Sequence, residues 1–125
     1  LLCPTKIYVQ IVKKLTSKLQ INSISHITGG GLSENIPRVI PKELQAVLDV
    51  KSWRRPAIFS WIQDQGNIDT EEMYRTFNCG IGMVICVNRN NVDSALRILN
   101  QDQISASVIG HISKRLTDQE PIRFV

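Results

Sequence analysis

At residues 26–38 the chain carries His26-Ile-Thr-Gly-Gly-Gly-Leu-Ser-Glu-Asn-Ile-Pro-Arg38, a stretch in which three consecutive glycines join two elements. A β-prone run, Ile24–Thr28, precedes the glycines, and residues 32–36 can form a helical turn that Pro37 limits. Glycine reaches positive φ and lets other groups approach the backbone closely. A strand, a bare turn and a helix start direct backbone N–H groups toward one point, which favours an anion or phosphate site.

The same glycines also fit a tight strand-to-helix turn that binds nothing. Two polar residues three positions apart follow the turn and share a face if the segment is helical. The guanidinium of Arg38 suits a charge-assisted contact with phosphate, although Arg38 can instead pair with Glu34 on the surface. The candidates for ligand contact at this turn are therefore Thr28, Gly29, Gly30, Gly31, Asn35 and Arg38.

His26 is the candidate for proton transfer, because an imidazole titrates near neutral pH. Side chains alternate along a strand, so His26 and Thr28 are expected on one face, with Ser25 and Ile27 on the other. The alternative is a hydrogen-bonded histidine that supports the loop. His111 has no comparable neighbours in the sequence, and no role is assigned to it.

A second glycine-containing turn lies at Asn78-Cys-Gly-Ile-Gly82, between an expected helix and a strand. It can bring Arg75 and Asn78 close to the first turn, where both would contact the ligand. The alternative is an architectural turn that serves only to connect the two elements.

Hydrophobic periodicity predicts mixed elements around one sheet. We expect helices over residues 5–20, 56–65, 69–77 and 91–99, and strands over 23–28, 45–49, 83–87, 106–112 and 122–125. Residues 83–87 are apolar on both faces, which is typical of a central strand. Asp69-Thr-Glu-Glu72 resembles a capping box, and the polar residues 114–121 predict a hairpin.

Composition indicates one globular domain over residues 1–125, with 42% hydrophobic and 21% charged residues. No apolar run approaches the ~20 residues that span a bilayer, so we expect no membrane association and a cytoplasmic location. The net charge of +4 predicts a solvated basic surface and no nucleic-acid partner. Cys3, Cys79 and Cys86 lack metal-ligand spacing, so free thiols and no metal site are expected.

In five ordered blocks the chain resembles the C-terminal domain of phosphoribosylformylglycinamidine cyclo-ligase, also called aminoimidazole ribonucleotide synthetase. The resemblance covers nearly the whole chain. The blocks are Pro4-Thr-Lys-Ile-Tyr8, His26-Ile-Thr-Gly-Gly-Gly-Leu32, Glu34-Asn-Ile-Pro-Arg38, Phe59-Ser-Trp-Ile62 and Glu72-Met-Tyr-Arg-Thr-Phe-Asn-Cys-Gly-Ile-Gly82.

The resemblance implies an α+β fold, a layered α/β/α domain with a mixed sheet that is partly ferredoxin-like. It also implies a ligase of de novo purine synthesis, which converts formylglycinamidine ribonucleotide to aminoimidazole ribonucleotide with consumption of ATP. The formamide oxygen is thought to be phosphorylated, after which a substrate nitrogen closes the imidazole ring. Members are two-domain homodimers.

In that family the N-terminal domain supplies most of the ATP and Mg²⁺ site. Because the chain begins at Leu1 rather than Met, we expect it to be the C-terminal half of such an enzyme, without the N-terminal domain. It should then hold no tightly bound cofactor and be inactive alone. Two alternatives remain open. One is another member of the superfamily, of the selenophosphate synthetase, thiamine-phosphate kinase or hydrogenase-maturation type, and the other is a non-catalytic basic binding module.

Overall fold

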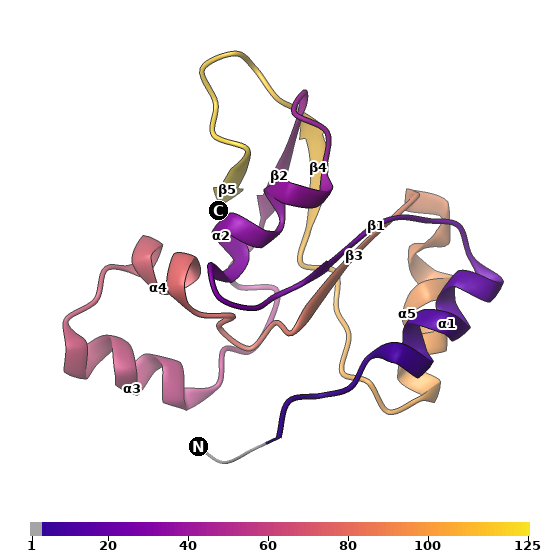
Figure 1. Ribbon diagram of the computed structural model, residues 1–125, viewed down its shortest axis with the longest axis horizontal. Coiled ribbons are helices and arrows are strands. Elements are labelled where there is room, and N and C mark those ends of the chain that lie inside the picture. The colour runs from indigo at the N-terminus through magenta and orange to yellow at the C-terminus, as the bar shows by residue number, and fades with distance from the viewer. Residues whose placement is uncertain (1–3) are drawn as a thin grey trace. The chain divides into compact units, whose positions relative to one another are not determined.

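A computed structural model describes residues 4–125, which form the expected α+β structure (Figure 1). The helices are α1 (Val9–Lys18), α2 (Gly31–Asn35), α3 (Ala57–Gly66), α4 (Thr70–Thr76) and α5 (Val92–Gln101), with 3-10 turns η1 (Pro37–Val39) and η2 (Arg89–Asn91). The strands are β1 (Ile21–His26), β2 (Leu44–Leu48), β3 (Met83–Val87), β4 (Gly110–Lys114) and β5 (Ile122–Phe124).

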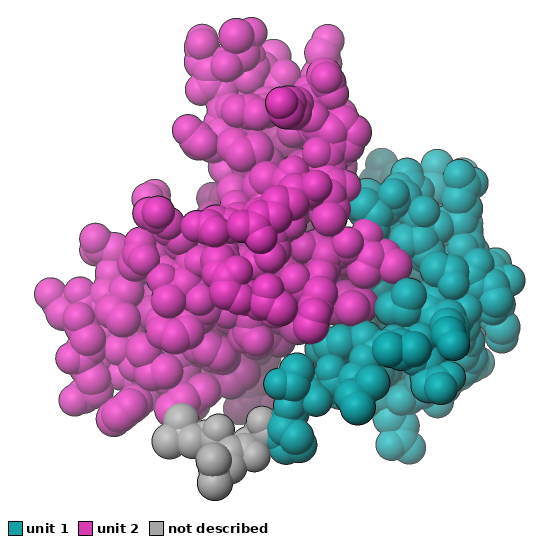
Figure 2. All heavy atoms as spheres, viewed as in Figure 1, with its two compact units in different colours: residues 1–23, 85–107 teal, residues 24–84, 108–125 magenta. Residues whose placement is uncertain are grey.

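The chain divides into two compact units, shown in different colours in Figure 2. Unit 1 consists of residues 1–23 and 85–107, and unit 2 of residues 24–84 and 108–125. Each unit has its own apolar core. The unit boundaries fall within β1 and β3, so each of these strands has residues in both units.

Unit 1 is built on the packing of α1 against α5. The helix-period stripe of α1 buries Ile11 and Leu15, which cluster with Ala95 and Ile98 of α5. Leu15 is only 1% exposed and forms the centre of this contact. On the surface, Lys14 Nζ of α1 lies 2.8 Å from Oδ1 of Asp102, the residue that follows α5, and this ion pair links the two helices.

Unit 2 contains a three-stranded sheet in the order β4-β2-β5. The central strand β2 pairs antiparallel with β4 and parallel with β5, so that Val47 lies opposite both His111 and Arg123. Because β2 is covered on both edges, Gln45–Leu48 are all buried. The hairpin predicted at residues 114–121 is wrong, since β2 lies between the two strands that this segment connects.

The strand β3 has the predicted bounds but is not a central strand. It pairs with β1 in a separate two-stranded sheet, and its five residues are all half-buried. The prediction of one sheet is therefore also wrong. An apolar run identifies a strand that is covered on both faces, but the cover can come from helices and loops as well as from a large sheet.

The two short helices beside the glycine turns, α2 and α4, begin and end within one residue of the predicted positions. Pro37 begins η1 with one residue between it and the end of α2, as expected for a residue that cannot continue an α-helix. Asp69 is the N-cap residue of α4, but its side chain accepts no capping hydrogen bond, so the predicted capping box is not formed. The helices α2 and α4 pack against each other and carry the polar residues of the candidate site.

Candidate functional site

The first turn spans Thr28–Gly31 and connects β1 to α2. Gly31 N donates to Thr28 O at 3.0 Å, and Gly30 has a φ of +93°, which together resemble a type II turn. An ideal Cβ at Gly30 would lie 2.6 Å from Glu34 Oε2, so the carboxylate of this chain covers one side of the turn. The turn therefore forms as predicted, with an internal anion close to its backbone.

Gly31 is required for packing. Its φ is +54°, and a Cβ would meet the backbone oxygen of Tyr74 and lie 2.6 Å from that of Phe77. The start of α2 can approach the end of α4 only because this residue has no side chain. Gly29 differs, since nothing lies within 4 Å of its Cβ position and the residue is exposed.

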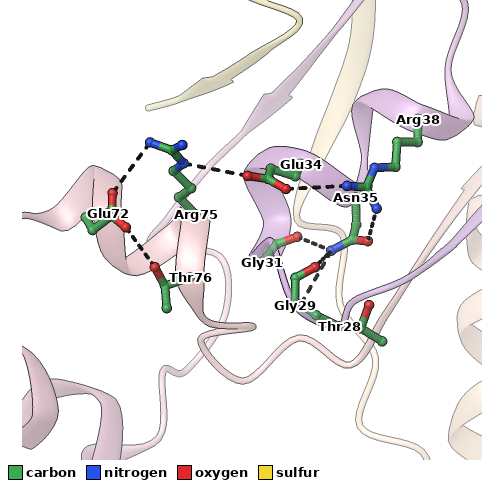
Figure 3. A network of polar contacts seen from close by, with 9 residues as sticks. All are labelled: Thr28, Gly29, Gly31, Glu34, Asn35, Arg38, Glu72, Arg75 and Thr76. Atoms are coloured by element: carbon green, nitrogen blue, oxygen red, sulfur yellow. Dashed lines mark hydrogen bonds and ion pairs between the residues drawn. The ribbon is translucent and has the colours of Figure 1, made fainter.

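Asn35 holds the turn together from inside (Figure 3). Its side chain is buried, and Nδ2 donates to the backbone oxygens of Gly31 at 2.8 Å, Gly29 at 3.1 Å and Thr28 at 3.4 Å. The residue had been predicted to contact a ligand. In the structure its donors are directed at the turn, so Asn35 shapes the surface that Thr28 and Gly29 present.

The second turn spans Asn78–Ile81 and connects α4 to β3. Ile81 N donates to Asn78 O at 2.9 Å, and the φ values of Cys79 (+49°) and Gly80 (+98°) have the signs of a type I′ turn. Asn78 Oδ1 accepts a hydrogen bond from Gly80 N at 3.0 Å. Each asparagine that the sequence singled out is thus bound to its own turn.

Cys79 is fully buried beneath this turn, with Sγ 3.5 Å from Met73 O. Burial raises the pKa of its thiol, and the charge of Arg55 offsets part of that rise. Its carbonyl accepts a hydrogen bond from Trp53 Nε1 at 3.1 Å. A neutral, enclosed thiol of this kind serves packing and is a poor nucleophile.

The two turns lie side by side, as the sequence analysis had predicted. Ile27 N donates to Gly82 O at 3.0 Å, which joins the start of the first turn to the end of the second. Together with α3 they surround an open cavity of about 230 Å³. It is lined by Ile27, Thr28, Gly29, Phe59, Thr76, Phe77 and Asn78.

Of the predicted site residues, Thr28, Gly29 and Asn78 line this cavity, whereas Gly30, Gly31, Asn35, Arg38, Arg75 and His26 do not. Phe59, Thr76 and Phe77 also line the cavity, and Thr76 and Phe77 were not predicted as site residues. Thr76 and Phe77 lie between the predicted site residues Arg75 and Asn78 in the sequence, and this position could have identified them as further candidates. Phe59 stands with Trp53 and Trp61 in an aromatic group whose spacing fits a stacking platform for a base or, more commonly, the core or a subunit contact.

The two arginines lie in an ion-pair network outside the cavity lining (Figure 3). Glu34 bridges them, with Oε2 3.4 Å from Arg38 Nη2 and Oε1 3.6 Å from Arg75 Nε. Arg75 also lies 3.9 Å from Glu72, which accepts a hydrogen bond from Thr76 Oγ1 at 2.9 Å. These side chains are mostly exposed, so each pair contributes roughly 0–1 kcal/mol.

His26 lies in β1 with the predicted alternation. His26 and Thr28 are exposed, and Ser25 and Ile27 are buried. His26 does not line the cavity, whose lining begins one residue later, at Ile27.

Cys79 and Cys86 are free thiols, while the third cysteine, Cys3, lies outside the described residues. Within residues 4–125, no group of three or more His, Cys, Asp or Glu side chains could hold a metal ion. In the same range, no helix combines the length and apolar character needed to cross a bilayer.

Residues 1–119 match a known protein family, described as AIR synthase related protein, C-terminal domain. The match spans the glycine turns, the cavity lining and the ion-pair network, and it stops within the connection between β4 and β5. The chain therefore belongs to the family of AIR synthase related proteins, and it corresponds to the C-terminal domain of that family.

Proposed function

We propose that the chain is the C-terminal domain of a phosphoribosylformylglycinamidine cyclo-ligase. In this proposal it acts within a cytoplasmic, homodimeric enzyme of purine synthesis that converts formylglycinamidine ribonucleotide to aminoimidazole ribonucleotide. ATP and Mg²⁺ would be bound mainly by an N-terminal domain.

One observation carries this proposal. The segments that carry the cyclo-ligase resemblance, residues 26–32 and 72–82, are far apart in the sequence and supply most of the lining of a single cavity. Segments that served only as connections would have no need to share a cavity. The Phe59 side chain, from a third block of the resemblance, completes the lining.

The geometry suggests separate roles for the cavity residues and for the two arginines. Thr28, Gly29 and Asn78 would hold the substrate in the cavity. Arg38 and Arg75 would contact its phosphate after exchanging the carboxylate of Glu34 for the phosphate oxygens, since a guanidinium binds both groups in the same way.

The remaining predicted residues have supporting roles. Gly30 and Gly31 provide the backbone shape of the first turn, and Asn35 braces it. His26 remains the proposed proton-transfer residue, because it lies on the exposed face of β1, two residues before Thr28.

The proposal is tested by supplying the N-terminal domain of a cyclo-ligase as a separate polypeptide and measuring ADP release. We expect ADP to form only when both polypeptides and formylglycinamidine ribonucleotide are present. The chain alone should release none. ADP release that is independent of this substrate, or dependent on a different acceptor such as thiamine phosphate, would contradict the cyclo-ligase assignment and favour another member of the superfamily.

The second candidate is a basic module that binds nucleic acid. The net charge of +4 is the only observation that favours it, and two of the arginines are already paired with carboxylates. Binding of a random oligonucleotide should therefore be weak at physiological salt. Submicromolar binding with a steep dependence on salt concentration would support this candidate instead.

A further inference from the structure

The second turn, Asn78–Ile81, contains a residue in an unfavourable backbone conformation. Cys79 has a φ of +49°, in the left-handed region that few residues other than glycine adopt. Such a conformation persists only where the surrounding structure holds it, and it is often found at functional sites. Asn78, the residue before it, lines the cavity. The contacts that hold Cys79 therefore also help to determine where Asn78 lies.

Two different segments hold Cys79. Its Sγ lies 3.5 Å from Met73 O of α4, and both residues are fully buried. Its carbonyl oxygen accepts a hydrogen bond of 3.1 Å from Trp53 Nε1, which comes from a distant part of the sequence. Because a carbonyl oxygen in the interior is costly to leave unpaired, we expect this hydrogen bond to stabilise the left-handed conformation.

Trp53 belongs to the segment between β2 and α3, and this segment lies directly against the second turn. A Cβ at Gly80 would lie 2.5 Å from Pro56 Cδ and 3.6 Å from Arg54 O, so the contact requires a residue without a side chain. The Trp53 ring also meets the Tyr74 ring of α4 edge-on, with centroids 6.2 Å apart and planes inclined by 67°. Trp53 thus contacts both the turn and the helix that precedes it.

Tyr74 connects Trp53 to the rest of unit 2. The Tyr74 ring stacks on Phe124 of β5, with centroids 4.5 Å apart and planes inclined by 16°. The carbonyl oxygen of Tyr74 lies against Gly31 of the first turn. Trp53 is therefore one end of a row of three aromatic rings that adjoins both glycine turns.

Trp53 does not line the cavity, and it lies outside the five blocks that carry the cyclo-ligase resemblance. Its contacts are with the second turn and α4. We infer that Trp53 is a positioning residue of the candidate site: its indole N–H fixes the carbonyl of Cys79, and through the turn it sets the place of Asn78 in the cavity lining. The inference rests on the proposed function for the identity of the ligand, and it deepens that function by adding a residue that acts on the site from outside the lining.

Amide hydrogen exchange, measured by NMR on the 125-residue chain, tests whether Trp53 holds the turn. The reporters are the amides of Gly80, which donates to Asn78 Oδ1 at 3.0 Å, and Ile81, which donates to Asn78 O at 2.9 Å. Trp53→Phe keeps an aromatic ring and removes the N–H donor. Both amides should then exchange about fivefold faster, the ratio that ~1 kcal/mol from one lost hydrogen bond produces.

Two comparisons separate this local effect from a general loss of stability. The amides of β2, in the same unit, should exchange at an unchanged rate in Trp53→Phe. Trp61→Phe makes the same substitution at a position of α3 that is 59% exposed, so it is the matched control and should leave Gly80 and Ile81 unaffected.

A smaller change is available if Trp53→Phe folds poorly. The chain has two tryptophans, so in the Trp61→Phe background Trp53 is the only one. Expression in a tryptophan-requiring host that is supplied with the benzothiophene analogue of tryptophan then replaces the indole N–H by sulfur and keeps the shape of the ring. The same acceleration at Gly80 and Ile81 is expected.

The assay with a separate N-terminal domain tests whether the position of the turn matters for the ligand. We expect Trp53→Phe to raise the KM for formylglycinamidine ribonucleotide several-fold with kcat nearly unchanged. A variant that only folded less completely would show a lower kcat at an unchanged KM, because its active molecules would be fewer but identical to those of the unmodified chain.

The inference is overturned if both forms that lack the indole N–H exchange Gly80 and Ile81 at the original rates, if the amides of β2 accelerate as much as those of the turn, or if kcat falls while KM does not change. Its failure is distinguishable from failure of the proposed function. Amide exchange requires neither substrate nor N-terminal domain, so it decides the role of Trp53 even if no ADP is released. Normal ADP release with unchanged KM and unchanged exchange in Trp53→Phe would overturn the inference and leave the proposed function standing.

Discussion

The three consecutive glycines look equivalent in the sequence, but they occupy three different environments. Gly29 faces the cavity and has open space at its Cβ position. Gly30 adopts a φ of +93° beside the Glu34 carboxylate, and Gly31 lies against the backbone oxygens of Tyr74 and Phe77. Only the last two positions need glycine for the fold, so Gly29 is the one available for contact with a ligand.

Substitution by alanine should separate these roles. Gly31→Ala forces a side chain into a left-handed conformation and against two carbonyl oxygens, so the free energy of unfolding should fall by about 2–4 kcal/mol. Gly29→Ala, the matched control two residues away, should change it by less than about 0.5 kcal/mol. Urea-induced unfolding followed by tryptophan fluorescence measures both values, and equal losses would contradict this account of the turn.

Cys79 couples stability to alkaline pH. Burial raises the pKa of its thiol, so the unfolded chain releases this proton at a lower pH than the folded chain does. The contribution of the thiol to stability is therefore complete below the ordinary thiol pKa of about 8.5 and is lost as the pH rises toward the raised value.

We expect the free energy of unfolding to decline between pH 8 and pH 10, with a shallower decline in Cys79→Ala. The pKa values of Tyr74 and Cys86 are also raised by burial, so part of the decline should remain in this variant. Denaturant titrations across this pH range provide the comparison. An identical slope in the variant would show that Cys79 does not take part.

Among the helices, α2 and α4 are the pair that brings the two turns together. Gly31 allows their backbones to approach, and Glu34 of α2 reaches Arg75 of α4. The ion pair is long and exposed, so close packing rather than charge holds the two helices in contact. We therefore expect Glu34 to affect the binding of anions by Arg38 and Arg75 more than it affects the stability of the fold.

Glu34→Gln tests that role. The free energy of unfolding should change by less than about 1 kcal/mol, whereas inorganic phosphate should bind several-fold more tightly at Arg38 and Arg75, which lose a competing carboxylate. The guanidinium N–H signals of both arginines report on binding. Glu71→Gln makes the same change of charge at an exposed position of α4 and should leave phosphate binding nearly unaltered. Equal effects of the two variants would indicate net charge alone.

Across the described residues, the buried apolar side chains form two cores. Ile11 and Leu15 with α5 form one, and a larger cluster around Leu32, Met73 and Cys79 forms the other. The cavity and the ion-pair network belong entirely to unit 2. A substitution that destabilises unit 1 should therefore change the structure of the candidate site little.

Leu15→Ala examines this separation. Removal of a side chain that is 1% exposed should destabilise unit 1 by about 2–5 kcal/mol and accelerate amide exchange in α1 and α5. Amides of β2 and α4 should change far less. Val9→Ala, at a position of the same helix that is 56% exposed, is the control and should have little effect. Equal acceleration in both units would show that they unfold as one.

Local patterns in the sequence were sufficient for most elements and for the two turns. The stripe of α1, the bounds of β3, the stop at Pro37 and the glycine turns depend on contacts within a few residues, which the sequence displays directly. The pairing of strands could not be read in this way. The central position of β2 and the separation of β3 into a second sheet depend on partners that are far away along the chain.

The residues of the candidate site also fall into two groups, those that local sequence indicates and those that depend on tertiary packing. Composition and spacing identified Thr28, Gly29 and Asn78, because turn residues with polar side chains are recognisable locally. The aromatic side of the cavity, the inward direction of Asn35 and the pairing of both arginines with Glu34 emerged only from the folded chain. A side chain's neighbours in space follow from how α2, α3 and α4 pack, and packing is a property of many residues together that no single segment specifies.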